Sequence, residues 1–379
     1  MRHLAHLLIF FAFTSQAAEL PEPNTSVRAL GMGNAYTAVV NDKDALFYNP
    51  AGLARVKGVN LTLFNLRGGA DGRDVYDTYN SARSAAKYAD TLRAFYGKNI
   101  WIGAGAKVAL ATPGFGFSAY DSADVAAYLS NPAFPNLNFR YTNDIGYTAG
   151  IAFDLLPTVH FGVTGARITR TGAQMPIGIS TLGTLSNQTL LDQISNSGTA
   201  YAASAGLILG LPTPALPRAS VVLKNIGQTT FTKDSGTRAP PPIEGELIVG
   251  AAFDIDLPLI TITPAIDYKH ITNTREVAQK KIHMGLEVDL PFIALRGGSS
   301  QGYYTAGLGV DLGIIKADAA TYGVELGEYP GQKEDRRYVL ELTIELGFDF
   351  SFGFLKGLGG GAGGSDSSGG RSRGLKQRR

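Results

Sequence analysis

The chain of 379 residues contains no cysteine, few charged residues and no charge-free apolar run long enough to form a membrane-spanning helix. The absence of cysteine excludes disulfides, thiolate zinc sites, iron–sulfur clusters, cysteine nucleophiles and lipid attachment to an N-terminal cysteine. Charged residues make up only 17% of the chain. The first apolar stretch, residues 4–13, is shorter than the ~20 residues that a spanning helix needs. A helical membrane protein is therefore not expected.

Glycine and aromatic residues are abundant instead. The chain has 47 glycines, about 12% against roughly 7% in average proteins, together with 17 tyrosines and 19 phenylalanines. This composition differs from that of an ordinary helical cytosolic enzyme. A single β-barrel domain can account for the whole length.

The first residues have the pattern of a secretory signal peptide. Arg2-His3 is a short basic start, residues 4–13 are mostly apolar, and residues 15–17 fit a small-x-small cleavage site. We therefore expect residues 1–17 to be a signal peptide and the mature chain to begin at Ala18.

Alternation of apolar and polar residues is strongest near the C-terminus. Every even-numbered residue from Tyr338 to Phe354 is apolar, whereas the odd-numbered residues from Glu341 to Gly353 are acidic, hydroxylated or glycine. A soluble sandwich strand usually has about 5 or 6 residues, and a tilted membrane-spanning strand needs about 9 to 11. The length therefore favours a bilayer, with lipid on the apolar face and a polar lumen on the other. The same alternation recurs in residues 145–155, 247–255, 260–268, 282–290 and 304–312.

Two kinds of connection alternate between these expected strands. The short kind repeats an Asp-Leu sequence followed by proline or glycine, and proline belongs at a tight turn. The long kind is polar, contains glycine and varies in length. Short turns at one end and long loops at the other are typical of outer-membrane barrels. The short connections are residues 154–157, 256–258, 289–291 and 311–313, and the long ones are residues 111–143, 170–199, 227–244, 270–280 and 326–337.

We therefore predict an all-β fold, a closed antiparallel transmembrane barrel at residues 59–354, because unpaired backbone amides are too costly in hydrocarbon. A secreted soluble β-protein is the alternative, and it gives no reason for the asymmetry of the connections.

Three segments fall outside the alternating pattern. Residues 18–58 have little period-two character, and residues 73–96 contain helix formers with a partial apolar stripe, so both would suit a plug inside a lumen. Residues 355–379 form a Gly/Ser-rich tail with a basic end. We expect this tail to be solvated and disordered, and contact with an anionic partner is the alternative.

Two runs near the N-terminus resemble a known family. RALGMGNA at residues 28–35, followed by NDKDALFYNPAGL at residues 41–53, resembles the opening of the FadL-like outer-membrane transporter superfamily, including its OMPP1 and PorV types. The resemblance implies a barrel of about 14 strands with an N-terminal hatch that blocks the lumen. Asn49, Pro50 and Ala51 would form the turn of this hatch, where asparagine tolerates turn geometry and proline presets the next φ.

The hatch would carry Asp42 and Asp44 into the lumen. Buried carboxylates without partners are costly, so we expect them to pair with Lys107 and Lys224. The small residues expected to leave room for the hatch turn are Gly103, Gly105, Gly162, Gly307 and Gly309.

The last expected strand carries a second motif. Glu345-x-Gly347-x-x-Phe350-x-Phe352 is similar to the signal by which barrel-assembly machinery recognises last strands. That signal normally closes a protein with a terminal aromatic residue, whereas residues 355–379 follow here. Barrel-assembly machinery and outer-membrane lipid are the partners that this motif and the barrel imply.

Little in the sequence indicates catalysis. The GxSxG run at residues 298–302 joins two expected strands, whereas the hydrolase elbow needs a strand followed by a helix. His160, His270 and His283 have no spacing that fits an HExxH zinc site. Asp42-x-Asp44 lacks the remaining positions of an EF-hand. We therefore expect no enzymatic step, no cofactor, no metal site and no nucleic-acid partner.

The long loops carry apolar stretches, residues 115–117 and 125–129 in one and residues 175–177 and 182–194 in another. Contiguous apolar patches often mark binding grooves, so these loops would collect hydrophobic molecules, unless they pack on one another. The sequence thus predicts a channel in the outer membrane of a diderm bacterium for passive uptake or lateral passage of hydrophobic small molecules, of the long-chain fatty acid or hydrocarbon type. The alternative is a non-transporting, PorV-like barrel that anchors or carries secretion-system or surface-assembly proteins.

Overall fold

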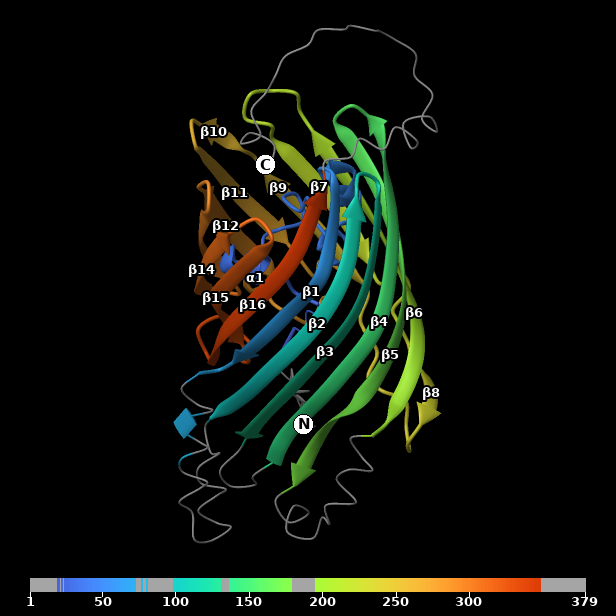
Figure 1. Cartoon of the computed structure of the whole chain (residues 1–379). Helices are drawn as coiled ribbons and strands as arrows, with labels where there is room; N and C mark the ends of the chain where they lie inside the picture. Colours follow the sequence, from blue (N-terminus) through green and yellow to red (C-terminus); the bar gives the residue numbers. More distant parts are fainter. Residues whose placement is uncertain are drawn as a thin grey trace, which may run out of the picture.

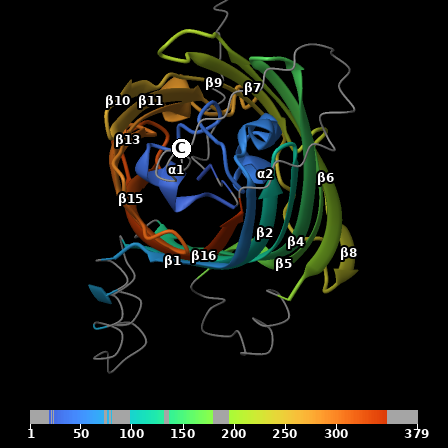
Figure 2. The ribbon, with the colours of Figure 1, turned by 45° about the horizontal axis from the view of Figure 1, so that its top comes forward.

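The computed structural model describes residues 19–20, 22, 24–72, 76–77, 80, 98–130, 136–178 and 195–348. These residues form a closed antiparallel barrel of 14 strands around an N-terminal segment (Figures 1 and 2). The predicted all-β fold, closed barrel and strand number are therefore confirmed. Among the described residues, no helix is long and apolar enough to span a membrane.

The strands follow one another around the ring in chain order. The barrel strands are β1 (Val59–Ala70), β2 (Asn99–Thr112), β3 (Phe115–Ser130), β4 (Asn136–Leu156), β5 (Val159–Gly178), β6 (Ser197–Gly210), β7 (Arg218–Lys224), β9 (Glu246–Ala252), β11 (Ile260–Tyr268), β12 (Ile282–Asp289), β13 (Ile293–Ser300), β14 (Tyr303–Asp311), β15 (Ile315–Glu325) and β16 (Glu334–Phe348). Two short strands extend the wall, since β8 (Thr232–Ser235) pairs with β6 and β10 (Ile255–Leu257) pairs with β11.

Pairing of the first strand with the last closes the ring. β1 and β16 are antiparallel over the whole length of β1, with one register irregularity between Thr62 and Phe64. On the opposite side, β9 pairs with both β7 and β11. Each barrel strand therefore has a neighbour on both sides, and the sheet has no open edge.

The two ends of the barrel differ in their connections. Short connections join β2 to β3, β4 to β5, β12 to β13 and β14 to β15 at one end, which we call the turn end. The Asp-Leu sequences at residues 154–157, 289–291 and 311–313 lie there. Longer connections, such as residues 269–281 and 326–333, lie at the opposite end, which we call the loop end.

The predicted bounds of two of the long loops, residues 111–143 and 170–199, are wrong. β3 and the start of β4 occupy most of residues 111–143, and β5 continues to Gly178. The alternation of side chains persists there, but small and polar residues replace the apolar ones, so the sequence hides the strands. Phe115 and Phe117, expected in a loop, lie on β3 beside the turn end and are 37% and 39% exposed. The apolar residues at 182–194, the expected insert at 73–96 (apart from residues 76, 77 and 80) and the tail at 355–379 lie outside the described residues.

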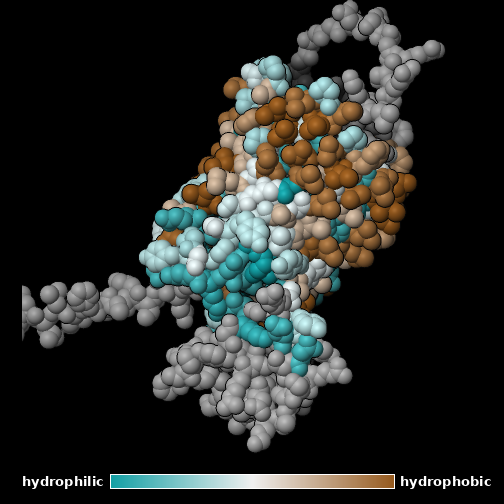
Figure 3. Space-filling model, turned by 90° about the vertical axis from the view of Figure 1, so that its left-hand side faces the viewer, coloured by the Kyte–Doolittle hydropathy of each residue, from teal (hydrophilic) through white to brown (hydrophobic). Residues whose placement is uncertain are grey.

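The alternation within strands divides apolar from polar side chains. Leu342 and Phe348 on β16 are each 43% exposed, whereas Thr343 between them is 1% exposed and faces the lumen. Figure 3 shows one apolar outer face of the barrel and its change to polar surface toward the loop end. Surrounding hydrocarbon would bury this apolar belt, as in a membrane-spanning barrel.

Residues 24–56 lie inside the ring of strands (Figure 2), and together with the described residues 19, 20 and 22 they are called the N-terminal segment. It contains α1 (Val27–Gly31), α2 (Ala45–Tyr48) and the 3₁₀ helix η1 (Pro50–Arg55). A second 3₁₀ helix, η2 (Ala278–Lys281), precedes β12 at the loop end. The largest buried apolar cluster consists mostly of this segment, and the wall contributes alanines to it. The segment therefore brings its own apolar core into a polar lumen.

We predict that Leu342→Arg lowers the free energy of unfolding in a bilayer by about 2 to 4 kcal/mol if the residue lies near the midplane. Leu342→Phe is the matched control, and it should be nearly neutral because lipid adapts to the larger side chain. Denaturant titration in lipid vesicles measures both changes. If Leu342 were instead packed within protein, the phenylalanine would cost about 1 to 3 kcal/mol by overpacking, and the outward assignment would fail.

Candidate functional site

The N-terminal segment spans the lumen from the loop end to the turn end. Near the loop end, the carboxylate of Glu19 lies 2.8 Å from Arg140 and 2.9 Å from Arg337. Near the turn end, Gly114 donates its backbone N–H to the carbonyl of Leu53 at 3.0 Å. The lumen is therefore occupied along the length of the barrel.

A chain of buried ion pairs joins this segment to the wall. Arg28 of α1 donates from Nε and Nη2 to the two carboxylate oxygens of Glu287, at 2.8 and 2.5 Å. Glu287 also accepts from Arg296 at 2.7 Å, and Arg296 donates to Asp318 at 2.6 Å. A bidentate guanidinium–carboxylate pair fixes orientation as well as distance. Strands β12, β13 and β15 thus hold α1 in one position.

Asp267 on β11 binds the backbone of the segment. Its carboxylate accepts hydrogen bonds from the backbone N–H groups of Tyr36 and Thr37 at 2.9 and 3.0 Å, and from the Thr37 hydroxyl at 2.8 Å. Asp267 has no exposed surface. A buried carboxylate needs such donors, so the segment satisfies a polar group of the wall that would otherwise be unpaired.

Asn49, Pro50 and Ala51 form a turn that starts η1. The Asn49 side chain accepts from the Ala51 backbone at 3.1 Å and donates to the Thr37 carbonyl at 2.9 Å. Pro50 occupies the first position of η1, where its missing N–H costs nothing.

Glycines of the wall allow this turn to approach closely. A Cβ on Gly162 would lie 2.4 Å from the Pro50 carbonyl carbon, and one on Gly206 would lie 2.0 Å from Asn49 Oδ1. Among the glycines expected beside the turn, the structure places Gly162 there. Gly307 instead approaches Gly31 of α1, and the nearest atoms to Gly103, Gly105 and Gly309 belong to wall residues.

The two acids of the segment have different partners. Asp44 lies 2.5 Å from Lys107 of β2, whereas Asp42 accepts from Arg28 at 3.4 Å and from the Tyr36 hydroxyl at 3.0 Å. Burial acts to raise the pKa of Asp44, but the ammonium groups of Lys107 and Lys43 outweigh it and hold this pKa well below its usual value. The expectation that Lys224 pairs with these acids is wrong.

Lys224 turns toward other groups. Its ammonium lies 3.8 Å from the Glu246 carboxylate of the neighbouring strand β9 and 5.8 Å from the centre of the Tyr48 ring. It therefore contacts the segment through an aromatic face rather than through a carboxylate.

The expected assembly signal lies only partly within the described residues. Glu345 and Gly347 belong to β16, and Phe350 and Phe352 lie outside the described range. Glu345 faces the lumen, accepts from Lys316 at 2.6 Å and from Thr62 at 2.9 Å, and lies 3.9 Å from Lys43. Its carboxylate thus also belongs to the ion pairs that hold the N-terminal segment.

The GxSxG run forms the β13–β14 hairpin and meets a histidine. Ser300 Oγ lies 3.2 Å from Nδ1 of His283, and the same nitrogen lies 2.9 Å from the carbonyl oxygen of Gly33. Since a carbonyl only accepts, Nδ1 carries the proton and cannot also accept one from Ser300. Ser300 is 6% exposed and His283 is 1% exposed, so the pair packs against the segment. The described residues contain no group of three His, Asp or Glu side chains arranged to hold a metal ion.

The wall is interrupted between β6 and its next neighbours. β7 pairs with residues 205–210 of β6, and β8 pairs with residues 197–199. The ladder is broken over residues 200–204, which we call the wall break. It retains one backbone bond, from Ile226 to the carbonyl of Ala203 at 2.8 Å.

Local backbone conformation explains why β7 ends there. Asn225, Gly227 and Gln228 have positive φ angles of 49°, 81° and 66°, which bend the chain away from the ladder. The Asn225 N–H donates to the Ser204 hydroxyl at 3.2 Å instead of continuing the strand pairing.

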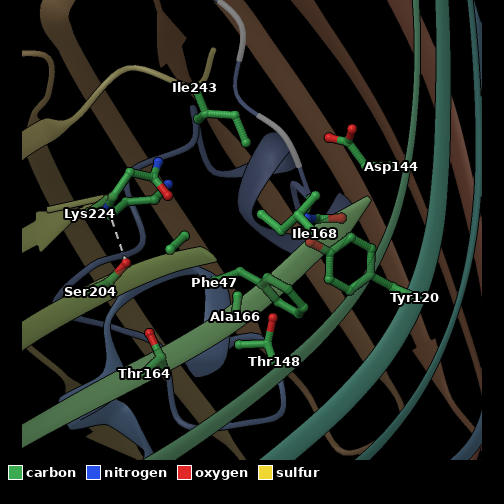
Figure 4. Close-up of a pocket in the computed structure, with 13 residues that line it drawn as sticks. Phe47, Tyr120, Asp144, Thr148, Thr164, Ala166, Ile168, Ser204, Lys224 and Ile243 are labelled. Carbon is green, nitrogen blue, oxygen red and sulfur yellow. Dashed lines mark hydrogen bonds between the residues drawn. The ribbon is translucent and has the colours of Figure 1, made fainter. Parts of the chain in front are cut away.

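A pocket lies inside the barrel beside the wall break (Figure 4). Its volume is about 60 Å³. It borders the wall break through four of its lining residues, Ala202, Ser204, Lys224 and Asn225. Its remaining lining combines apolar side chains with hydroxyls and a few polar groups; these residues are Asn24, Phe47, Tyr120, Asp144, Thr148, Thr164, Ala166, Ile168 and Ile243.

Phe47 connects this pocket to the N-terminal segment. Its ring packs edge-on against Tyr120, with the ring centres 5.4 Å apart. A cavity of about 150 Å³ is known to bind benzene, so a pocket of 60 Å³ is too small for an aromatic ring unless a side chain moves. Movement of Phe47 would require α2 to shift or its side chain to rotate.

Comparison with known proteins identifies solved structures with a similar fold, but no match by sequence. No protein-family model and no curated protein matches the chain. The structure is similar to the toluene transporter TodX of Pseudomonas putida, with a TM-score of 0.51 and 11% identity over 87% of this chain and 98% of that one. Lower TM-scores of 0.47 and 0.40 are found for the Ralstonia pickettii toluene transporter TbuX, at 11% identity over 86% and 98% of the chains, and for a Pseudomonas aeruginosa FadL homologue, at 11% identity over 88% and 100%. The chain therefore has the barrel fold of TodX.

We predict that Gly206→Ala destabilises the barrel by about 1 to 3 kcal/mol, because the new methyl group collides with Asn49 and the turn must move. Gly165→Ala on β5 is the control, since nothing lies within 4 Å of its added Cβ. Denaturant unfolding of the two variants measures the difference. Equal stability of the two variants would show that the turn does not contact the wall at Gly206.

We also predict an acid-dependent loss of stability that involves Glu19. Burial opposes its ionisation, but Arg337 and Arg140 outweigh burial and lower its pKa from 4.5 to about 2. A lowered pKa stabilises the folded state above pH 4.5, and this contribution disappears as the pH falls toward 2. Unfolding of Glu19→Gln, compared with the parent chain between pH 5 and pH 2, should show a smaller slope of stability against pH. Identical slopes would mean that Glu19 is not paired in the folded state.

Proposed function

We propose that this chain is an outer-membrane channel through which hydrophobic small molecules, of the hydrocarbon or fatty-acid class, pass passively from the loop end into the bilayer. The observation that carries the proposal is the wall break at residues 200–204, with a pocket directly inside it. The apolar belt and the closed sheet support a location in a membrane.

Passage through the side of the barrel follows from the occupied lumen. The N-terminal segment reaches from Arg140 near the loop end to Gly114 near the turn end, and ion pairs and backbone hydrogen bonds hold it to the wall. A solute that entered at the loop end would meet this segment before reaching the turn end. The wall break is an exit that leaves these contacts intact, and it leads an apolar solute into the surrounding bilayer.

The pocket has the mixed character that such a route needs. Ala166, Ile168 and Ala202 offer apolar contact, while Ser204 and Lys224 lie at its side (Figure 4). Small-molecule sites commonly combine an apolar lining with a few polar groups. In this proposal Phe47 is the gate, because its ring lines the pocket and packs against Tyr120. The N-terminal segment is then a hatch, and the turn at Asn49, Pro50 and Ala51 is its fixed end.

The similarity to TodX supports the substrate class. That protein is a toluene transporter, and it shares the barrel fold at 11% identity. Identification of the ligand within the hydrophobic class depends on the experiment below.

We predict that a disulfide across the wall break abolishes uptake. The native chain has no cysteine, so Ala203→Cys with Ile226→Cys can form only the intended bridge. The 2.8 Å backbone bond between these residues brings them close enough for the test. Uptake of radiolabelled long-chain fatty acid or toluene by a deletion strain expressing the oxidised variant should fall at least tenfold and recover on reduction.

A second disulfide controls for rigidity of the barrel. Leu308→Cys with Ala319→Cys joins directly opposed residues of β14 and β15, on intact wall. Oxidation of this variant should leave uptake unchanged. If the locked wall break transports as well as the control, the lateral route is excluded. If deletion of the protein leaves uptake unchanged but removes exported surface proteins, the chain is instead a non-transporting anchor or carrier for secretion partners.

A further inference from the structure

An arginine on the outer surface of the barrel has no ion-pair or hydrogen-bond partner among the described residues. Arg167 of β5 is exposed, and it makes no ion pair or hydrogen bond with the part of the chain that the structure describes. Its position on the strand places its side chain on the same outer face as the apolar belt. A cation on the lipid-facing surface of a barrel is costly unless it reaches a polar or anionic group.

Two exposed tyrosines stand on either side of this arginine. Tyr147 on β4 and Tyr201 on β6 are the direct cross-strand partners of Arg167, and they are 50% and 76% exposed. Tyrosines are enriched where a membrane meets water, because the ring prefers the apolar side and the hydroxyl prefers the polar side. Three adjacent side chains thus present a guanidinium group between two phenol groups.

The position of Arg167 coincides with the polar edge of the apolar belt. The next outward-facing pair toward the turn end is Gly165 on β5 and Ala203 on β6. The next outward-facing pair toward the loop end is Thr169 on β5 and Thr199 on β6. The surface therefore changes from apolar to hydroxylated at Arg167. This is the level at which lipid headgroups begin.

An apolar groove continues from this position across the outer wall. Its volume is about 260 Å³, and its outward-facing lining has one carboxylate among apolar and aromatic side chains; these residues are Phe64, Ala106, Val108, Ala119, Asp121, Ile145 and Tyr147. Val108, Ala119, Tyr147 and Arg167 are successive cross-strand partners on β2, β3, β4 and β5. Small side chains such as Ala119, between the larger Phe64 and Tyr147, make the surface concave.

Strand tilt gives this row a direction relative to the membrane. The strands β1 to β6 run obliquely in Figure 1, so a row perpendicular to them descends from β2 toward the loop end at β5. The groove therefore lies deeper in the belt than Arg167. This is the orientation of a lipid whose headgroup is at the arginine and whose acyl chain follows the groove inward.

We propose that Arg167, Tyr147 and Tyr201 form a binding site for the phosphate headgroup of an anionic membrane lipid, with one acyl chain of that lipid in the groove that ends at Phe64. Guanidinium binds phosphate in a bidentate manner, and each tyrosine hydroxyl can donate one further hydrogen bond. The site lies on the outer surface beside the wall break, to which Tyr201 belongs, and it is separate from the pocket inside the barrel.

Two carboxylates face the same surface. Asp234 of β8 accepts from the Thr199 hydroxyl at 2.7 Å, and Thr199 lies on the strand next to Arg167, one outward position toward the loop end. Asp121 on β3 lies one outward position toward the loop end and two strands from Arg167, and standard strand geometry separates their Cα atoms by roughly 12 Å. Asp121 also lines the groove. In the proposed site the phosphate contacts the guanidinium group directly, and Asp121 and Asp234 oppose it from the neighbouring strands.

Native mass spectrometry tests this site on the full mature chain. The protein is transferred to nanodiscs of phosphatidylcholine with a minor fraction of phosphatidic acid, and the lipids retained after release are counted. We expect the parent chain to retain phosphatidic acid preferentially and Arg167→Gln to retain about fivefold less, the effect expected for one arginine near an anionic surface. Heat-modifiable migration on gels verifies that each variant is folded.

Arg336→Gln is the matched control. Arg336 is also on the outer wall, but its guanidinium lies 3.9 Å from the centre of the Tyr304 ring and donates to the Tyr304 carbonyl at 2.7 Å. This variant should retain as much phosphatidic acid as the parent chain. If Arg336→Gln loses as much as Arg167→Gln, or if Arg167→Gln loses none, a specific site at Arg167 is excluded.

Competition with inorganic phosphate separates a lipid site from a simple anion site. A lipid held by both headgroup and acyl chain should remain bound in millimolar inorganic phosphate. Displacement of phosphatidic acid by inorganic phosphate would show that the groove contributes nothing and would overturn the proposal. Retention of phosphatidylcholine in equal amount would do the same, because the headgroup would then not be selected by charge.

Discussion

Pairing of buried charges between the N-terminal segment and the inner wall is the interaction on which this structure depends. Each strand has an apolar outer face that meets lipid and a polar inner face that lines the lumen. When the N-terminal segment fills the lumen, the carboxylates and guanidinium groups of the inner face lose contact with water, which costs free energy. Arg28 with Glu287, and Asp44 with Lys107, satisfy these groups across the boundary. The segment and the barrel therefore form one folding unit.

This dependence also determines where the wall can open. β12, β13 and β15 hold the segment through ion pairs, whereas the wall near residues 200–204 contacts it mainly through the pocket and the Phe47 side. Among the described residues, the ion pairs that join the segment to the wall involve strands other than β6 and β7. A local opening there would leave the ion pairs on the far side unbroken, so opening and retention of the segment are compatible.

The sequence predicted the barrel well because a lipid-facing strand has a strict two-residue period, as residues 338–348 show. It failed where small and polar residues interrupt the apolar face, as in residues 118–124 and 142–144, since such side chains are equally typical of a loop. The pair of Asp44 and Lys107 could be predicted because a buried carboxylate needs a cation. The contacts of Asp267 and Glu287 with the N-terminal segment could not be predicted, because the position of a residue on a strand does not show which part of the segment it meets inside the lumen. The wall break was also missed, although Asn225 and Gly227 were a local signal for the end of a strand.

Closure of the ring by the first and last strands has a consequence for biogenesis. The N-terminal segment directly precedes β1, and β1 receives its second partner only when β16 has been made. Until then the sheet is an open curved surface, and Arg28 and Asp44 can reach their partners from its exposed concave side. After closure the same groups would have to be drawn through a narrow end while desolvated. The segment is thus best placed to serve as the template around which the sheet curves, and a chain that lacked it would have to close around water.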